Sequence, residues 1–398
     1  MTTMTTSQST LQPTVWTPRL PPELTDQIID ALSDDVSSLT ACTLSSRQLR
    51  CRSRYHLFCA IRFDFILHRS FNRCENFSEK CQNVAPLVRS LTLSENAVWF
   101  VGPSRKWITS EPQLPIAFRM MKNLTSLHLV KVELVGINII WPEVEELEMK
   151  QCSVTNLGTF LGGFHKLNKL ALCDVGIVEA TSLSSEVSLD LEELVITHGA
   201  SQSDARTIKC LLPLLPTPPR IRRLTYPLYY PEWDIPQYDV IPYTRLDELF
   251  LMGASEPKIL VPNIRNVTKL RLLVTPPGHW DQAEAHRACD ELTDWLIDLL
   301  CKAQRGYLEE IQLEYCLMGI SGTQGKWAEL DAVLSKMELN KVELVFSATL
   351  HEWRREEEEK SKWPLWEGKL EGLVIKYAAF FEQVERRGLL TVSRGYRS

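Results

Sequence analysis

Several signatures of membrane, secreted and metal-binding proteins are absent from this 398-residue chain. It has no run of about 18 apolar residues, the length that a membrane-spanning helix requires. None of its 11 cysteines form a Cys-x-x-Cys pair, and its eight histidines are scattered without a metal-binding motif. The amino-terminal segment lacks the basic start and apolar core of a secretory signal. We therefore expect a soluble protein of a reducing compartment, cytoplasmic or nuclear, with no cofactor, no metal and no membrane partner.

Motifs for catalysis are missing as well. Gly319 and Gly325 are one residue too far apart for a phosphate-binding loop, and Trp327 stands where Ser or Thr would hold Mg²⁺. His351-Glu352 is not followed by the second histidine of a zinc protease, and no Gly-x-Ser-x-Gly occurs. The sequence predicts that the protein is not an enzyme.

The charge balance gives no sign of a nucleic-acid partner. The net charge is −6 and the isoelectric point is near 5.9, so no overall attraction to a polyanion is expected. The four arginines between residues 47 and 54 fall within one short predicted helix. Since the other side of that helix is needed for packing, we interpret them as its polar face.

The stretch from Leu20 to Phe58 carries the pattern that organises our interpretation. Pro21 suits the start of a helix, because proline has a fixed φ and no N–H group. Leu24, Ile28 and Leu32 recur at every fourth residue and therefore form one apolar stripe. Two further short helices are expected before the stretch ends. Three helices of this size bury little surface alone, so the module is expected to press against another surface.

The same stretch resembles an F-box, especially the fungal form. The resemblance lies in Leu20-Pro21-Pro22-Glu23-Leu24, Ile28-Ile29, Leu39, Cys42, Leu44 and Tyr55-His56-Leu57-Phe58. Members of that family bind the adaptor Skp1, which docks a substrate receptor onto a cullin-based ubiquitin ligase. Thr25 and Leu49 depart from the family pattern, in which many members carry a hydrophobe and a Trp. The resemblance implies an adaptor-binding surface of Leu20, Pro21, Leu24, Ile28, Ile29, Leu32, Leu39 and Leu49.

A second pattern, apolar-x-x-apolar-x-apolar, recurs ten times from Val88 onward. Its copies are Val88-Leu91-Leu93, Leu124-Leu127-Leu129, Val144-Leu147-Met149, Leu167-Leu170-Leu172, Leu191-Leu194-Ile196, Ile221-Leu224-Tyr226, Leu246-Leu249-Leu251, Val267-Leu270-Leu272, Leu308-Ile311-Leu313 and Leu339-Val342-Leu344. Regular steps between middle residues, such as 127 to 147 and 147 to 170, are 20 and 23 residues long. These steps match leucine-rich repeats, although the repeats are degenerate and only Cys152 and Cys173 suggest the polar ladder of that family.

The last two apolar positions of each copy are two residues apart and face one side of a strand. Stacking one strand per copy predicts a parallel sheet with a continuous leucine core. The residue before each middle position then lies on the other face: Ser90, Ser126, Glu146, Lys169, Glu193, Arg223, Glu248, Lys269, Glu310 and Lys341. Its charge alternates in sign from Glu146 onward, which predicts a ladder of opposite-charge neighbours that specifies the register.

The row between the two apolar positions is apolar near its centre. Val195 and Phe250 lie in that row, and a loop between residues 216 and 243 is rich in proline and aromatics. We predict a client-binding surface of Val195, Tyr229, Trp233 and Phe250, because Trp and Tyr are enriched in interface hot spots. The alternative is a loop that folds onto its own repeat.

The carboxyl-terminal region changes in character. Residues 352–362 form a charge run, interpreted as a solvated helix, and Leu370 to Val384 fits an amphipathic helix that caps the last repeat. The predicted organisation is α/β: a disordered leader (1–18), a three-helix F-box (19–63), a leucine-rich-repeat solenoid (64–351), and a charged helix with a capping helix (352–398).

Two functions are compatible with this organisation. The leading prediction is the substrate-recognition subunit of an SCF-type ubiquitin ligase, which binds a Skp1-like adaptor, a cullin through it, and a client protein. The alternative is a non-catalytic repeat scaffold whose F-box-like segment recruits no ligase.

Overall fold

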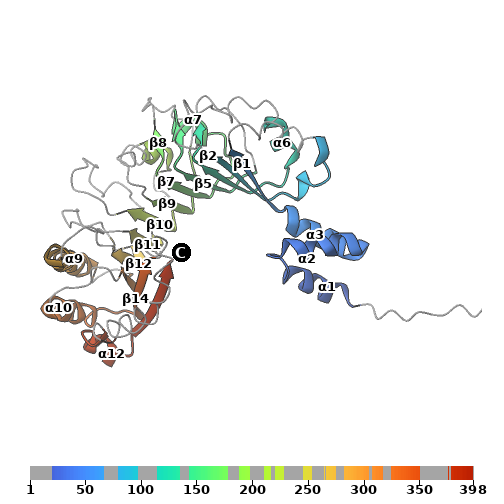
Figure 1. Ribbon diagram of the computed structural model, residues 1–398. Helices are drawn as coiled ribbons and strands as arrows, with labels where there is room; N and C mark the ends of the chain where they lie inside the picture. Colours follow the sequence, from blue (N-terminus) through green and yellow to red (C-terminus); the bar gives the residue numbers. More distant parts are fainter. Residues whose placement is uncertain are drawn as a thin grey trace, which may run out of the picture.

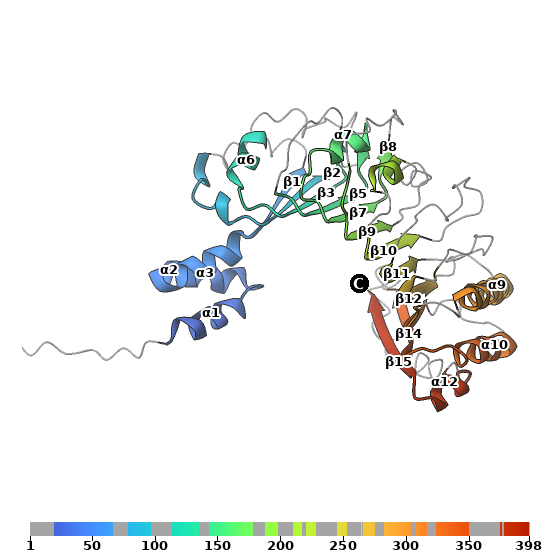
Figure 2. The same cartoon turned by 180° about the vertical axis from the view of Figure 1, so that it is seen from behind.

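The computed structural model has an α/β architecture, in which a long parallel sheet follows three amino-terminal helices (Figures 1 and 2). The sheet lines the inner side of an arc, and the later helices lie on the outer side. The predicted α/β class is confirmed. The structure describes residues 20–66, 79–96, 114–134, 143–177, 188–197, 210–216, 220–227, 245–252, 264, 266–274, 282–303, 307–316, 324–349, 375 and 378–397.

The three-helix module consists of α1 (Pro22–Asp30), α2 (Val36–Ser45) and α3 (Arg47–Phe58). A proline opens α1, as predicted. The Asp35 carboxylate accepts the first free N–H groups of α2, and the Ser46 hydroxyl accepts one from α3. Both α1 and α2 pack on α3. The boundary predicted after residue 63 falls inside the first strand, because the helices end at Phe58.

The main sheet has twelve strands, all parallel, and their order in the sheet follows the chain. Ten of them, β2 to β14, are the ten copies of the predicted pattern. The strands are β1 (Ala60–Ile66), β2 (Ser90–Asn96), β3 (Ser126–Val130), β5 (Glu146–Lys150), β7 (Lys169–Cys173), β9 (Glu193–Thr197), β10 (Arg223–Pro227), β11 (Leu246–Met252), β12 (Val267–Val274), β13 (Glu310–Cys316), β14 (Lys341–Thr349) and β15 (Leu390–Arg397). A small second sheet contains β4 (Glu133–Leu134), β6 (Ser153–Val154) and β8 (Gly176–Ile177).

The register of the main sheet is the one that the pattern predicts. Leu147 pairs with Leu127 on one side and Leu170 on the other, and this alignment of middle residues continues to Val342. One backbone arrangement recurs between strands: the Glu145 carbonyl accepts the N–H groups of both Asn168 and Lys169. The middle residues of β2 to β14 are all buried, so the leucine core is continuous.

The outer side of the sheet is covered by short helical segments and two longer helices (Figure 1). These are η1 (Ala85–Leu87), α6 (Leu114–Met120), α7 (Leu157–Leu161), η2 (Leu212–Leu214), α9 (Gln282–Ala303) and α10 (Gln324–Leu334). The two longer helices bury apolar faces against the sheet, since Trp295, Leu299, Trp327 and Leu330 belong to the core. The helices thus complete the hydrophobic layer that the strands begin.

Three consecutive turns share a left-handed residue at the same position. Lys131, Gln151 and Asp174 each lie four residues after a middle leucine and have φ between 54° and 57°. A buried residue follows each of them, and in the second turn it is Cys152, whose thiol contacts the Leu129 carbonyl oxygen at 3.2 Å. Burial raises the pKa of this thiol to about 11, which keeps it neutral.

The equivalent of Cys152 in the next turn is Val175, not the predicted Cys173. Cys173 ends strand β7 opposite Lys150 and is half-buried. The prediction that Cys152 and Cys173 occupy equivalent positions of a polar ladder is therefore wrong, because Cys152 follows its strand and Cys173 ends its strand.

The carboxyl-terminal end differs from the predicted capping helix. A short helix, α12 (Glu382–Arg386), leads into β15, which pairs in parallel with β14 and so extends the sheet by one strand. The Asp331 carboxylate on α10 accepts the N–H groups of Gln383 and Val384 at the start of α12. The charge run at 352–362, and residues 370–374 of the predicted amphipathic helix, lie outside the described residues.

Aromatic and cationic contacts hold α12 against α10. The rings of Trp327 and Phe381 meet edge to face with their centroids 5.7 Å apart. The Arg387 guanidinium donates to the carbonyls of Ser335 and Met337, which follow α10. The last segment is therefore packed into the core and is part of the sheet.

Leu170→Ala tests the core register. Leu170 is 1% exposed between two other middle leucines, so its truncation should lower the free energy of unfolding by about 2–5 kcal/mol. Denaturant unfolding of the full chain would measure this change. Lys169→Ala is the control, since its exposed ion pairs are worth only about 0–1 kcal/mol. Equal effects of the two substitutions would contradict the register.

Candidate protein-interaction surfaces

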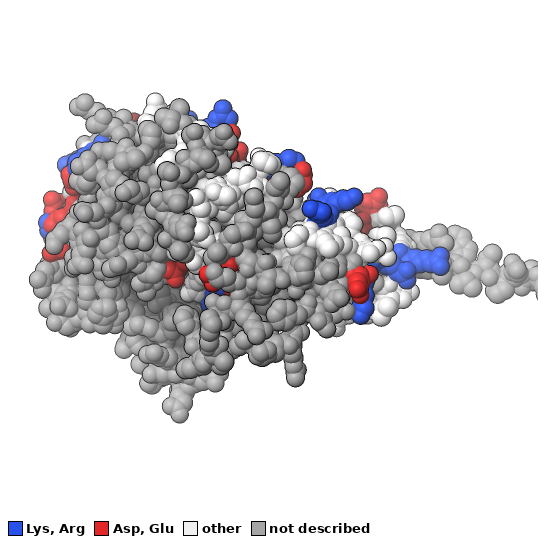
Figure 3. Space-filling model, turned by 90° about the horizontal axis from the view of Figure 1, so that it is seen from above, with Lys and Arg blue, Asp and Glu red and all other residues white. Residues whose placement is uncertain are grey.

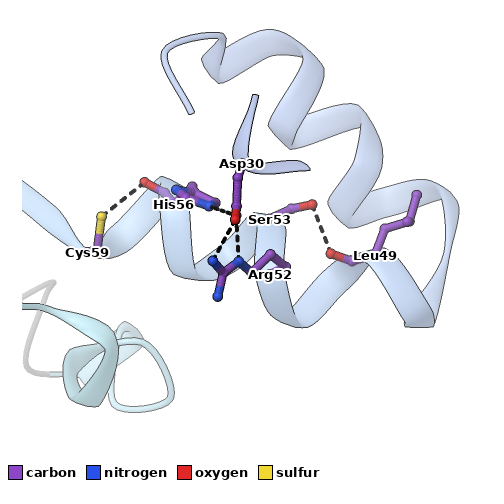
Figure 4. Close-up of polar contacts among 6 residues, drawn as sticks. All are labelled: Asp30, Leu49, Arg52, Ser53, His56 and Cys59. Atoms are coloured by element: carbon purple, nitrogen blue, oxygen red, sulfur yellow. Dashed lines mark hydrogen bonds and ion pairs between the residues drawn. The ribbon is translucent and has the colours of Figure 1, made fainter. Parts of the chain in front are cut away.

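Asp30, the last residue of α1, is held by two side chains of α3 (Figure 4). Its carboxylate accepts hydrogen bonds from Arg52 Nε at 2.6 Å and Nη2 at 2.8 Å, and His56 Nε2 lies 2.7 Å from Oδ1. A two-point arginine–carboxylate contact fixes orientation as well as distance. The hydrogen bond from Arg52, followed by that with His56, lowers the pKa of Asp30 from 3.8 to about 2. We call these three residues the α1–α3 clamp.

Exposed large hydrophobic side chains are concentrated on the three-helix module. Among the described residues, eight such side chains are exposed, and five of them lie in its first two helices or just before them. Those five are Leu20 (54%), Leu24 (47%), Ile28 (51%), Val36 (66%) and Leu44 (78%). Exposed apolar side chains gathered on one module mark an interaction surface more often than chance exposure does.

The structure separates the predicted adaptor-binding residues into three groups. Leu20, Pro21, Leu24 and Ile28 are exposed, whereas Leu32 and Leu49 are half-buried. Ile29 and Leu39 are each 1% exposed, so the prediction that they belong to an outer surface is corrected. Their physical role is to pack the module, because one face of each short helix must be buried against α3.

Two findings on the module were missed from the sequence. Val36 and Leu44 are its most exposed large hydrophobic side chains, eight residues apart on α2, and neither was assigned to the surface. Thr25, noted only as a departure from the family pattern, is buried beside Ile29. Its hydroxyl donates to the Pro21 carbonyl at 3.2 Å, so the polar group keeps a partner inside the module.

The module is joined to the sheet through the residue after α3. The Cys59 carbonyl accepts the N–H groups of Arg89 (2.7 Å) and Ser90 (2.9 Å), which begin the next strand. The same arrangement, in which one carbonyl accepts two successive N–H groups, links the later strands. The helix therefore leads without a spacer into the hydrogen-bond ladder of the sheet.

The charge ladder on the inner face of the sheet is confirmed in register. Lys169 lies 3.2 Å from Glu146 and 3.8 Å from Glu193, which also pairs with Arg223 at 3.0 Å. Farther along, Lys269 and Glu310 approach to 3.6 Å, while Glu248 pairs with Arg271. On the face shown in Figure 3, the described residues likewise mix both signs without one continuous patch of either.

The row beside the ladder holds two of the predicted client-binding residues. Val195 and Phe250 are half-buried on the inner face. One side of the Phe250 ring is covered by the Arg271 guanidinium, 4.5 Å from the ring centroid, and Glu248 holds that guanidinium at 3.3 Å. Tyr229 and Trp233 lie outside the described residues.

Comparisons with known proteins do not add to this description. No family model matches the chain, and no curated protein matches it either.

The described part of the chain lacks two further kinds of site. It holds no group of three or more His, Cys, Asp or Glu side chains placed to bind a metal ion. None of its helices combines the length and apolarity needed to cross a bilayer.

Asp30→Asn tests the α1–α3 clamp. Since the pKa of Asp30 is lower in the folded protein than its ordinary 3.8, its stabilising contribution is present above pH 3.8 and is lost as the pH falls towards 2. We expect faster amide hydrogen exchange in α1 of the variant at pH 7, with a smaller further change on acidification than in the wild type. Asp34→Asn, an exposed acid beyond α1, is the control. Unchanged α1 exchange in Asp30→Asn at pH 7 would contradict the clamp.

Proposed function

We propose that the chain is a substrate receptor of an SCF-type ubiquitin ligase. In this proposal α1–α3 act as an F-box that docks on a Skp1-like adaptor and, through it, on a cullin. The strands that follow act as a degenerate leucine-rich-repeat solenoid that binds a client protein. The observation that carries the proposal is that five large hydrophobic side chains are exposed on a three-helix module whose sequence resembles an F-box.

The five exposed hydrophobic side chains support adaptor docking on energetic grounds. Full burial of a large apolar side chain contributes roughly 1.5–3 kcal/mol, and each of the five is still about half exposed or more. Leu24 and Ile28 lie four residues apart, so they share one face of α1 and can enter one contact. The α1–α3 clamp fixes this face before any partner arrives, which lowers the ordering cost of binding.

The connection between module and sheet supports the receptor role. A receptor must present its client at a defined place relative to the adaptor. The Cys59 carbonyl joins the end of α3 to the sheet by two hydrogen bonds, and Asn123 Nδ2 donates to the Pro86 carbonyl nearby. The bonds to Cys59 connect the end of α3 directly to the start of β2.

The inner sheet face is the proposed client surface. Most of its charges are paired with one another, so its electrostatic field offers little long-range steering. Val195 and Phe250 provide apolar area in the row beside the ladder, as predicted from the sequence. Tyr229 and Trp233, which lie outside the described residues, belong to the same proposal on the evidence of the sequence.

Leu24→Asp combined with Ile28→Asp should remove adaptor binding. Each substitution would bury an unpaired carboxylate in an apolar contact, and loss of one hot spot alone costs about 2 kcal/mol, or roughly 30-fold in affinity. Pull-down of purified Skp1 by the full-length chain measures the effect.

Gln27→Asp combined with Ser37→Asp is the matched control. Both positions are exposed on the same module, and the pair adds the same charge without replacing an exposed hydrophobic side chain. The control should bind Skp1 as the wild type does. Wild-type Skp1 binding by the Leu24, Ile28 variant would overturn the site, and no Skp1 binding by the folded wild type would favour the scaffold alternative.

A further inference from the structure

A small uncharged area lies at the middle of the inner sheet face. Ala171, Val195, Thr225 and Phe250 are neighbours in register on β7, β9, β10 and β11. All four are half-buried, as are Cys173 and Thr197, which lie two residues farther along β7 and β9. We call these six residues the central floor. It is bordered by charged residues on three sides.

Most of the bordering charges are held by their own neighbours. Lys169, Glu193 and Arg223 are linked along the ladder. Glu148, beside Ala171, lies 2.6 Å from His128 Nδ1, on the side away from the floor. At the far end, Glu248 holds Arg271. A ligand on the floor would have to break these pairs in order to use them.

Lys150 is the exception at the near end. It is exposed, it pairs in register with Cys173 of the floor, and it belongs to no ion pair within the described part of the chain. The exposed Lys131 lies beside it, since the Lys131 N–H donates to the Lys150 carbonyl at 2.8 Å. Two exposed lysines that form no ion pair within the described part of the chain therefore lie next to each other along the backbone at this end of the floor.

We propose that the central floor binds an extended client segment whose aliphatic side chains cover Val195 and Phe250 and whose carboxylate side chain meets Lys150. This inference rests on the proposed client-binding role of the sheet. Strands lie about 4.8 Å apart, so the four steps from β5 to β11 span roughly 19 Å. An extended chain covers that distance with about six residues. The acidic residue therefore lies near one end of the segment.

Charge and shape favour this occupant over a basic one. At the near end, where Lys150 and Lys131 lie outside the ion pairs of the described residues, a basic segment would meet like charges and an acidic one opposite charges. The floor residues are small or β-branched except Phe250, whose ring is held by Arg271 and needs no ordering when a partner binds. Aliphatic side chains can approach the backbone closely over Ala171 and Thr225.

Selection of random decapeptides displayed on phage against the full-length protein tests the proposal. We expect enrichment of peptides that combine an acidic residue with aliphatic residues about three to five positions away. Val195→Lys should weaken their binding at least about tenfold. Lys150→Glu should reverse the preference and enrich basic peptides instead, which a general loss of folding would not do.

Two controls match these variants. Thr92→Lys is the control for Val195→Lys, because it places the same charge in the same row of the sheet on β2, four strands before β9. Lys336→Glu is the control for Lys150→Glu, because it reverses an exposed charge just after α10. Neither should alter peptide binding. No enrichment, enrichment independent of Val195 and Lys150, or self-association through this face in sedimentation experiments would each overturn the proposal. Pull-down of Skp1 is measured separately for the same variants. Loss of peptide binding by the central floor can therefore be distinguished from loss of adaptor binding by the three-helix module.

Discussion

Parallel pairing in a single register is the constraint on which the structure depends. Each strand repeats the position of its neighbour, so every side chain lies beside its equivalent at about 4.8 Å. On one face this repetition brings leucine against leucine and builds the core. On the other face it would bring like charges together, and alternation of sign removes that repulsion. The same register therefore requires apolar residues on the buried face and residues of alternating charge on the exposed face.

Much of this fold could be predicted from the sequence because the information is local. Two apolar positions separated by one residue fix which face of a strand is buried, and a slip of one residue would reverse the faces. The ten patterned strands, their register and the charge ladder follow from that rule. The shared face of Leu24 and Ile28 follows as well, since their spacing places them on one side of a helix.

Other features depend on contacts between distant segments and could not be predicted. Strand β15 lacks the first apolar residue of the pattern, because Arg387 stands there and contacts the carbonyls after α10 instead. The α1–α3 clamp joins Asp30 to residues 22 and 26 positions away on another helix. Ile29 and Leu39 were assigned to the outer surface from the family resemblance, and the sequence does not show which side of a three-helix packing each residue faces.

The unequal lengths of the connections have a consequence for how the chain tolerates added sequence. The middle residues Leu270 and Ile311 are 41 positions apart, yet they are direct neighbours in the sheet. The extra residues form α9 on the outer side and leave the inner face in step. The entropic cost of closing a loop rises only slowly with its length. Residues inserted between strands therefore enlarge the outer side of the arc and leave the spacing of the strands unchanged. The spacing of side chains on the inner face is thus independent of the length of the segments on the outer side.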